Sequence, residues 1–311
     1  MLISDAIEEY LGAKQNAITH STWVWYDTFL TYFYEWASQH RLTRLEELSA
    51  SHVQQFVSDC PTTNTHTRHA RAQIVKGFLN WCARDEDMGV RRRMVERIEM
   101  PKLVQSDISL LTEIEVGKLL RACEKTTQPH RNRALVLLLL DTGIRAAECC
   151  VDNDRPMEET GLRMDNLILG RGSESFIRVM GKGLKPRTIG LGQETTMAVR
   201  RYINRGRTYS CRDGTYVFLT KDGDPLSVRM LQQMLDELGE SAGIERQVHP
   251  HLFRHTFAVN QLLAGTSDLV LMRLMGHSTL ESTKIYVRAM NELQARKTAI
   301  SVVDQMRKNR K

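Results

Sequence analysis

Apolar residues recur at helical spacing along most of the chain, and this pattern predicts a mainly α protein. Between residues 23 and 34 the apolar positions fall on one helix face: Trp23, Tyr26, Leu30, Phe33 and Tyr34. Similar patterns predict helices from about residue 51, over 65–84, over 129–142 and through most of the chain beyond 227. The first hundred residues are therefore expected to be entirely helical.

Three local signals mark where helices begin and end. Pro101 cannot continue a helix, and it forces the preceding residue into an extended conformation. Thr112 and Glu115 have the spacing of a capping box, and Gly143 is a typical helix stop. The sequence thus predicts a helical N-terminal domain over residues 1–101, a linker over 102–109 and a second domain over 110–311.

Strand character is confined to about residues 168–191. Two runs rich in β-branched residues, 175–180 and 187–191, flank a glycine-containing loop that holds Lys182 between two glycines. We therefore expect a β-hairpin. The predicted fold class is mainly α, with a helical N-terminal domain and a mostly helical second domain that carries a small antiparallel β-sheet.

Composition narrows the class of protein only slightly. The net charge of +6 over 311 residues modestly favours a polyanionic partner. Six cysteines show no Cys-x-x-Cys pair and no regular spacing, so reduced thiols are expected. The first residues lack the features of a signal peptide, and the longest apolar run, 134–140, is too short to cross a bilayer. We expect a soluble, cytoplasmic protein with no membrane partner.

Six polar residues suited to the chemistry of a phosphate diester follow one another in the second half of the chain: Arg145, Lys182, His251, Arg254, His277 and Tyr286. An oxygen that attacks the phosphorus creates a pentacoordinate state with extra negative charge on the non-bridging oxygens. Guanidinium groups grip such oxygens with paired donors and stay charged, so Arg145 and Arg254 could stabilise that state without a metal. Glu148 follows Arg145 by one helical turn and is expected to orient its guanidinium.

Three histidines close together, His249, His251 and His255, raise the alternative of a metal site. Zinc sites usually add cysteine or carboxylate ligands, and none lies at a convincing spacing. His251 and Arg254 are separated by three residues, so a helix that begins after Pro250 would present both on one face. We therefore favour a phosphate-binding site over a metal site.

The order of these residues and the sequences around them resemble the tyrosine recombinase/integrase family. The matching segments are Thr-Gly-Ile-Arg-Ala-Ala-Glu at Arg145, Gly-Lys-Gly at Lys182, His-Leu-Phe-Arg-His at His251 and Arg254, Leu-Met-Gly-His at His277 and Ile-Tyr-Val-Arg at Tyr286. The resemblance implies a helical core-binding domain followed by a catalytic domain. It also implies a site-specific enzyme that cuts and rejoins DNA through a 3′-phosphotyrosine link, with no metal or ATP as cofactor.

The resemblance assigns the covalent chemistry to Tyr286 as the nucleophile. A phenol has a pKa of about 10, so this residue needs neighbouring cations and a base near neutral pH. By the same resemblance, Lys182 protonates the departing 5′ hydroxyl. Lys185 is a nearby rival, and Lys182 is preferred because Gly-Lys-Gly matches the family pattern.

The resemblance also assigns the histidines. It makes His251 a general acid or base beside the nucleophile and leaves His255 as a packing residue. It makes His277 a hydrogen-bond donor to the scissile phosphate.

Basic residues of the N-terminal domain are candidates for DNA contacts: Arg68, Arg71, Lys76, Arg91, Arg92 and Arg93. A two-domain clamp on double-stranded DNA would give them a function. The expected assembly is a homo-tetramer on DNA, monomeric or weakly associated when free, with accessory DNA-bending proteins as further partners. Beyond Tyr286, a terminal helix with a basic tail is hypothesised to pack on a neighbouring protomer.

Two other functions share part of this evidence. A topoisomerase IB-like enzyme would use the same chemistry to relax supercoils, and a DNA-binding protein without catalysis would keep only the basic surfaces. One segment departs from the family pattern: residues 152–160 form an acidic insert with a proline, which we expect to be a solvated loop. The DNA target and the biological role, whether integration, excision, dimer resolution or transposition, are left open by the sequence.

Overall fold

Two compact units make up the protein, and each has its own core. The computed structural model describes residues 1–62, 64–104, 107–156, 159–170, 174–180, 186–207 and 214–298. The first unit spans Met1–Ser106 and the second Asp107–Lys311. None of the described helices is long and apolar enough to span a bilayer.

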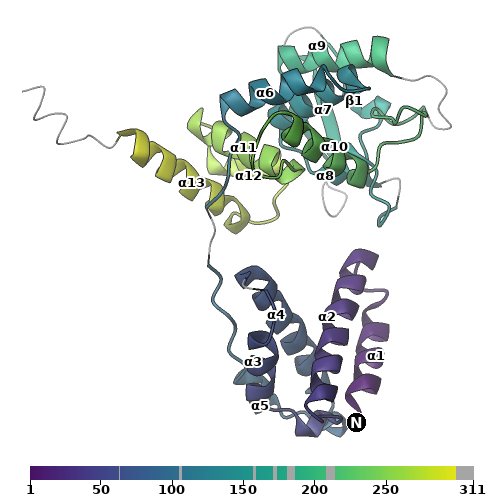
Figure 1. The fold of residues 1–311 in the computed structure, drawn as a ribbon, viewed down its shortest axis with the longest axis vertical. Coiled ribbons are helices and arrows are strands. Elements are labelled where there is room, and N and C mark those ends of the chain that lie inside the picture. The colour runs from purple at the N-terminus through teal and green to yellow at the C-terminus, as the bar shows by residue number, and fades with distance from the viewer. Residues whose placement is uncertain are drawn as a thin grey trace, which may run out of the picture. The chain divides into compact units, whose positions relative to one another are not determined.

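The first unit is helical, as predicted (Figure 1). Its helices are α1 (Ile3–Lys14), α2 (His20–Gln39), α3 (Ala50–Ser58), α4 (Thr65–Cys82) and α5 (Arg92–Glu96), with 3₁₀ turns at Leu45–Glu47 and Glu86–Met88. The stripe predicted on α2 faces the core, where Leu30 and Phe33 are fully buried. The exception is Tyr34, which is exposed because neighbouring residues on a helix point about 100° apart.

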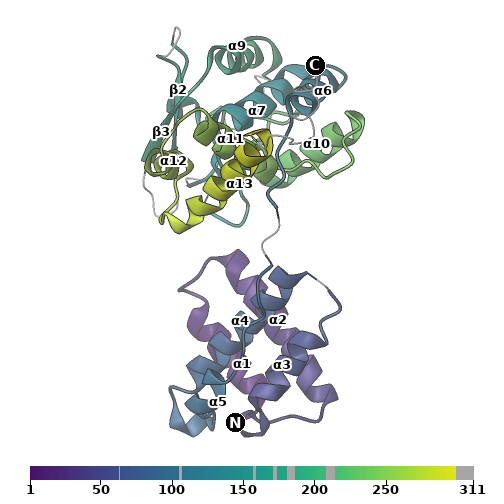
Figure 2. The same ribbon diagram turned by 90° about the vertical axis from the view of Figure 1, so that its left-hand side faces the viewer.

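The second unit is built around α7 (Pro129–Thr142), which packs against α6 (Glu113–Cys123), α9 (Gln193–Arg201) and α11 (Pro250–Leu263) (Figure 2). Helices cover α7 on several sides, and this explains its long apolar run. The other helical elements in the described part of the unit are α8 (Ala146–Cys149), a 3₁₀ turn (Met164–Asn166), a π turn (Tyr202–Gly206), α10 (Val228–Ser241), α12 (Asp268–Met275) and α13 (Glu281–Thr298).

The predicted hairpin is present and gains a third, short strand. The antiparallel sheet has the order β1 (Leu167–Ile168), β2 (Phe176–Met180), β3 (Pro186–Gly190). In its register Phe176 pairs with Gly190 and Met180 with Pro186. The acidic insert forms turns in its described part, with Asn153 and Asp154 exposed. The predicted fold class is thus confirmed.

A second, smaller core lies among α11, α12 and α13. It contains Phe257, Leu271 and Met275, and the ring of Tyr286 is part of it. The capping box predicted before α6 is also present: the Thr112 hydroxyl accepts from the Glu115 N–H at 3.2 Å, and the Glu115 carboxylate accepts from the Thr112 N–H at 2.8 Å.

Because the main cores of the two units are separate, a cavity in one unit should leave the other unit intact. Phe78 is fully buried in the first unit and packs edge-on against Tyr10 with ring centroids 5.6 Å apart. Replacing Phe78 by Ala should lower the free energy of unfolding of this unit by about 3–5 kcal/mol. Amide hydrogen exchange, followed peptide by peptide, should show faster exchange in residues 1–104 and unchanged protection in α7. Leu135→Ala is the matched control and should reverse the pattern; loss of protection in both units from either variant would refute independent cores.

Candidate active site

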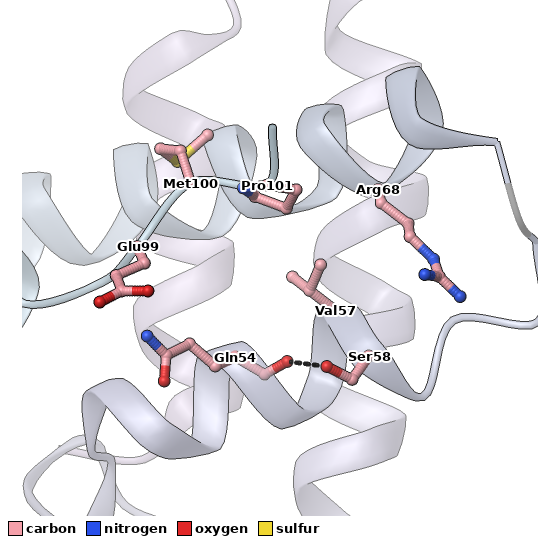
Figure 3. Close-up of a pocket in the computed structure, with 7 residues that line it drawn as sticks. All are labelled: Gln54, Val57, Ser58, Arg68, Glu99, Met100 and Pro101. Carbon is pink, nitrogen blue, oxygen red and sulfur yellow. Dashed lines mark hydrogen bonds between the residues drawn. The ribbon is translucent and has the colours of Figure 1, made fainter. Parts of the chain in front are cut away.

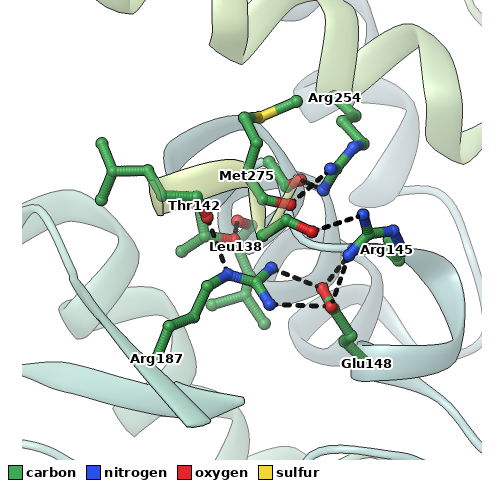
Figure 4. A network of polar contacts seen from close by, with 10 residues as sticks. Leu138, Thr142, Arg145, Glu148, Arg187, Arg254 and Met275 are labelled. Atoms are coloured by element: carbon green, nitrogen blue, oxygen red, sulfur yellow. Dashed lines mark hydrogen bonds and ion pairs between the residues drawn. The ribbon is translucent and has the colours of Figure 1, made fainter. Parts of the chain in front are cut away.

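A buried carboxylate holds the candidate site together. Glu148 lies on α8 with its side chain only 4% exposed, and it forms ion pairs with Arg145 and Arg187 (Figure 4). Its Oε1 accepts from Arg145 Nη1 at 3.0 Å and from Arg187 Nη1 at 2.8 Å, and its Oε2 accepts from Arg187 Nη2 at 2.7 Å. Burial by itself raises the pKa of this carboxyl, but hydrogen bonds and charge from Arg187 and Arg145 bring it below its ordinary value.

Arg145 is placed by the end of one helix and the start of the next. Gly143 ends α7 with a φ of +57°, and a side chain there would collide with the Phe257 ring. Arg145 then caps α8, and its backbone N–H donates to Glu148 Oε2 at 2.8 Å. Its side chain is 34% exposed, whereas that of Arg187 is 11% exposed. Arg145 is therefore the member of this pair that is accessible to a ligand.

Arg187 was not among the residues selected from the sequence. It lies on β3, 39 residues from Glu148, and nothing in its local sequence marks it as part of a site. The expected hairpin placed it on a strand, but a strand arginine is an ordinary surface residue. Only the pairing of β3 with β2, which sets where the strand runs, brings it to Glu148.

Arg254 is buried on α11, with a relative exposure of 4%. Its Nη1 donates to the Gly143 carbonyl at 2.6 Å and its Nη2 to the Met275 carbonyl at 2.6 Å. Burial, together with the charge of Arg145, lowers the pKa of Arg254 to about 10, so the group stays cationic at neutral pH. The sequence placed Arg145 and Arg254 in one site, and the structure brings them together.

Three consecutive carbonyls at the end of α12 each accept from a different arginine. Arg187 Nε donates to Leu274 at 2.7 Å, Arg254 Nη2 to Met275 at 2.6 Å and Arg145 Nη2 to Gly276 at 3.0 Å. The last carbonyls of a helix lack partners within the helix and carry partial negative charge. Gly276 then turns the chain with a left-handed backbone conformation, φ +62°, and His277 follows directly after this turn.

Tyr286 lies on α13 with a relative exposure of 3%. Its phenol Oη is 3.2 Å from Nδ1 of His255, and its ring stacks on that of His277 with centroids 6.1 Å apart. Burial raises the pKa of the phenol, and the charges of Arg254 and Arg145 act in the opposite direction. The sequence interpretation left His255 as a packing residue; the structure gives it the polar contact with Tyr286.

His251 and His277, two other predicted residues, make contacts with side chains other than Tyr286. His251 is exposed on α11, and its ring centroid is 6.2 Å from that of His255. His277 Nδ1 is 3.0 Å from the Thr283 hydroxyl, and burial followed by the charges of Arg254 and Arg145 lowers its pKa to about 4. Lys182 and its rival Lys185 lie outside the described residues. No group of three or more His, Cys, Asp or Glu side chains in the described ranges is arranged to hold a metal ion.

The six basic residues of the first unit that were predicted to contact DNA divide into two sets. The first set makes contacts within the unit: Arg68 Nε donates to the Thr62 carbonyl at 2.9 Å, Lys76 donates to the Ile98 carbonyl at 2.7 Å, and the Arg71 guanidinium lies 5.3 Å from the Tyr32 ring centroid. Arg68 also lines a pocket of about 350 Å³, together with Glu99 (Figure 3).

The second set, Arg91, Arg92 and Arg93, is exposed. Arg92 forms an ion pair with Glu96 at 3.6 Å. Arg91 and Arg93, with Arg97, line a surface pocket of about 490 Å³ next to Ser49, the residue that caps α3. These arginines are the stronger candidates for phosphate contacts.

Comparison with known proteins gives a consistent result. The sequence profile of the phage integrase family matches residues 109–292. The tyrosine recombinase XerC of Oceanobacillus iheyensis is 28% identical over 298 residues, which cover 94% of this chain and 92% of that protein. The tyrosine recombinase XerA of Pyrococcus furiosus is 34% identical over 197 residues, which cover 62% of each chain.

The fold agrees as well. The crystal structure of the XerH site-specific recombinase bound to palindromic difH substrate, in its post-cleavage complex, superposes with a TM-score of 0.71 at 19% identity, covering 94% of this chain and 83% of that one. The family profile and the related sequences define a DNA recombinase of the tyrosine class. The chain belongs to the phage integrase family, and the resemblance inferred from its ordered motifs is confirmed.

Removal of the Glu148 charge should destabilise the second unit. Glu148→Gln keeps the shape but leaves two guanidiniums without their carboxylate, and it should cost about 3–5 kcal/mol at pH 7 in urea unfolding. The pKa of Glu148 is lowered in the folded state, so its stabilisation is present above the unfolded value of about 4.3 and is lost as pH falls through the folded value. The difference from wild type should therefore be constant between pH 8 and pH 5 and shrink below about pH 4.

The matched control is Glu281→Gln, which removes a carboxylate that is 76% exposed and paired with Lys284. It should change stability by less than about 1 kcal/mol. A Glu148→Gln protein as stable as wild type at pH 7 would show that the ion pairs do not hold the site together.

Proposed function

We propose that the protein performs site-specific recombination by attack of Tyr286 on a DNA phosphate, forming a 3′-phosphotyrosine and a free 5′ hydroxyl. The observation that carries this proposal is that Arg145, Arg254 and His277 lie around one buried phenol, that of Tyr286. These groups come from four separate stretches of the chain. They match in kind what a pentacoordinate phosphate needs: fixed cations, a hydrogen-bond donor and a nucleophile.

The arginines act on the phosphate charge. Each is already held by backbone carbonyls or by Glu148, so little reorganisation is needed when charge develops on the non-bridging oxygens. His277, held at Nδ1 by Thr283, has Nε2 left to donate to the phosphate. His251, exposed on the same helix as Arg254, is assigned as an acid–base group near the phosphate. Lys182 is assigned as the acid that protonates the 5′ oxygen.

The phosphotyrosine conserves the energy of the phosphodiester bond. A 5′ hydroxyl of another strand can attack it and restore a DNA backbone, with no need for ATP. Exchange between two duplexes breaks four strands and requires four nucleophiles, which favours a homo-tetramer on DNA. In this assembly the end of α13 and the basic tail that follows it, which lies outside the described residues, are assigned to contacts between protomers.

The setting proposed for this activity is the integration, excision or transposition of mobile DNA in the cytoplasm, aided by accessory DNA-bending proteins. The two alternatives are less well supported. A non-catalytic DNA-binding protein has no physical reason to hold a phenol beside two fixed guanidiniums. A relaxing enzyme of the topoisomerase IB kind gains nothing from the comparisons, in which the two related proteins and the solved structure are named as recombinases.

Tyr286→Phe should abolish the covalent adduct and leave DNA binding within about twofold of wild type, because it removes the nucleophilic oxygen and little of the packing. The assay uses nicked duplexes drawn from the DNA that flanks the gene. The nick lets the cut fragment diffuse away, so the covalent complex accumulates and shifts on a denaturing gel. Tyr34→Phe, at an exposed tyrosine of the first unit, is the control and should form the adduct normally. An adduct with Tyr286→Phe would refute the assignment.

The arginines beside α3 should contribute to DNA affinity by neutralising backbone phosphates. Arg91→Ala combined with Arg93→Ala should weaken binding of all duplex sequences alike. It should also reduce the slope of log K against log salt by about 1 for each phosphate that the variant no longer neutralises. Fluorescence anisotropy over a salt series measures both. Arg44→Ala, at an exposed arginine already paired with Glu46 at 2.6 Å, is the control. An unchanged salt slope in the double variant would remove this surface from the DNA interface.

A further inference from the structure

We propose that Arg187 is a positioning residue for catalysis, which holds Arg145, through Glu148, in the geometry that grips the scissile phosphate. This assignment rests on the proposed function and specifies how one of its cations is placed. Arg187 lies on β3, and its guanidinium donates three hydrogen bonds within the protein. These bonds reach α8 and the end of α12, the two elements to which the side chain of Arg145 is also bonded.

The forked end of Arg187 is committed to Glu148. Its Nη1 donates to Oε1 at 2.8 Å and its Nη2 donates to Oε2 at 2.7 Å. A guanidinium grips a phosphate with this same pair of parallel donors. If Arg187 used the pair for DNA, it would leave a carboxylate that is only 4% exposed without this partner. We therefore assign Arg187 to the framework of the site and not to contact with the substrate.

Arg187 is also the group that ties Glu148 to the rest of the protein. In the described part of the chain, every other hydrogen bond to this carboxylate comes from Arg145 itself, from its backbone N–H at 2.8 Å and from its Nη1 at 3.0 Å. Without Arg187, Glu148 and Arg145 would hold only each other. The side chain of Arg145 is 34% exposed, so it would then lose its fixed direction toward the substrate.

A second connection between Arg187 and Arg145 runs through the end of α12. Arg187 Nε donates to the Leu274 carbonyl at 2.7 Å, and Arg145 Nη2 donates to the Gly276 carbonyl at 3.0 Å. A Cβ added to Gly276 would lie 2.9 Å from Arg187 Nη1 and 3.4 Å from Arg145 Nη1. Glycine therefore lets both guanidiniums pack closely against this turn. Displacement of Arg187 would loosen the turn as well as the carboxylate.

The placement of Arg145 should affect the rate of cleavage more than the affinity for DNA. A cation stabilises the pentacoordinate state only when its donors face the oxygens on which charge develops. Displacement by about 1 Å can lower such a rate by about 100-fold. Affinity, in contrast, comes from many phosphate contacts along the duplex, so one displaced arginine changes it little.

The test compares wild type with Arg187→Lys on a nicked duplex from the gene's flanking DNA, with protein in saturating excess. Lysine keeps a charge beside Glu148, but its ammonium cannot reproduce the planar fork that bonds both carboxylate oxygens. The rate of adduct formation should fall by about 10–100-fold, and DNA affinity should stay within about twofold of wild type. Arg178→Lys, at an exposed arginine of β2, is the matched control and should keep the wild-type rate. An Arg187→Lys rate equal to that of the control would overturn the proposal.

A double-mutant cycle separates the positioning of Arg145 from a general loss of structure. Arg145→Lys is measured alone and in combination with Arg187→Lys. Because Arg187 is proposed to act through Arg145, Arg187→Lys should cost less than about threefold when Arg145→Lys is already present. A smaller folded fraction would instead multiply both rates by the same factor. Equal costs in the two backgrounds would therefore overturn the proposal.

A second variant covers the case in which Arg187→Lys is unfolded at the assay temperature, as thermal unfolding would show. Glu148→Gln combined with Arg187→Gln removes both charges, so neither is left buried without its partner. This variant should fold and form the adduct at least about tenfold more slowly than wild type. A wild-type rate would show that Arg145 needs neither group. Absence of an adduct with wild type would instead overturn the proposed function, and this assignment with it.

Discussion

The site depends on the ion pairs that Glu148 forms with two guanidinium groups. A carboxylate buried to this degree is stable only when its partners satisfy it, and here Arg145 and Arg187 do so through three side-chain hydrogen bonds of 2.7–3.0 Å. The same bonds tie α8 to β3, two elements that are far apart in the sequence. Arg187 also reaches the end of α12, so the position of Arg145 depends on β3 and α12 as well as on its own helix.

The end of α12 is the second support of this arrangement. Its final carbonyls accept one hydrogen bond from each of the three arginines, which converts an ordinary helix terminus into the meeting point of α8, α11 and β3. The chain then turns at Gly276 and places His277 against Tyr286. A single terminus thus orients the cations and the ring that stacks on Tyr286. Substitutions at Gly276 would disturb both, since an added side chain would meet the guanidinium of Arg187.

The sequence predicts the parts of this molecule that depend on local signals. It does not predict contacts between residues that are far apart in the chain. Capping at Thr112, the helix stop at Gly143 and the hairpin are local, and all are found in the structure. α9 and the π turn after it were not anticipated, because threonines make up part of the buried face of α9, which consists of Thr195, Thr196, Ala198 and Val199. Arg187 could not be selected because its partner is 39 residues away. The contact of His255 with Tyr286 likewise requires the packing of α11 on α13, which spacing alone does not reveal.

Charge explains why such a site can be stable without DNA and still act on it. Three guanidiniums and one carboxylate leave two net positive charges, and these lie beside a phenol and imidazoles that are partly buried. Burial raises the pKa of Tyr286 and lowers those of His255 and His277, so the phenol stays protonated and the rings stay neutral in the free protein. A phosphodiester brings one negative charge, and the pentacoordinate state brings about two. The charge of the cluster therefore matches the transition state more closely than the bound substrate, which is the condition for catalysis.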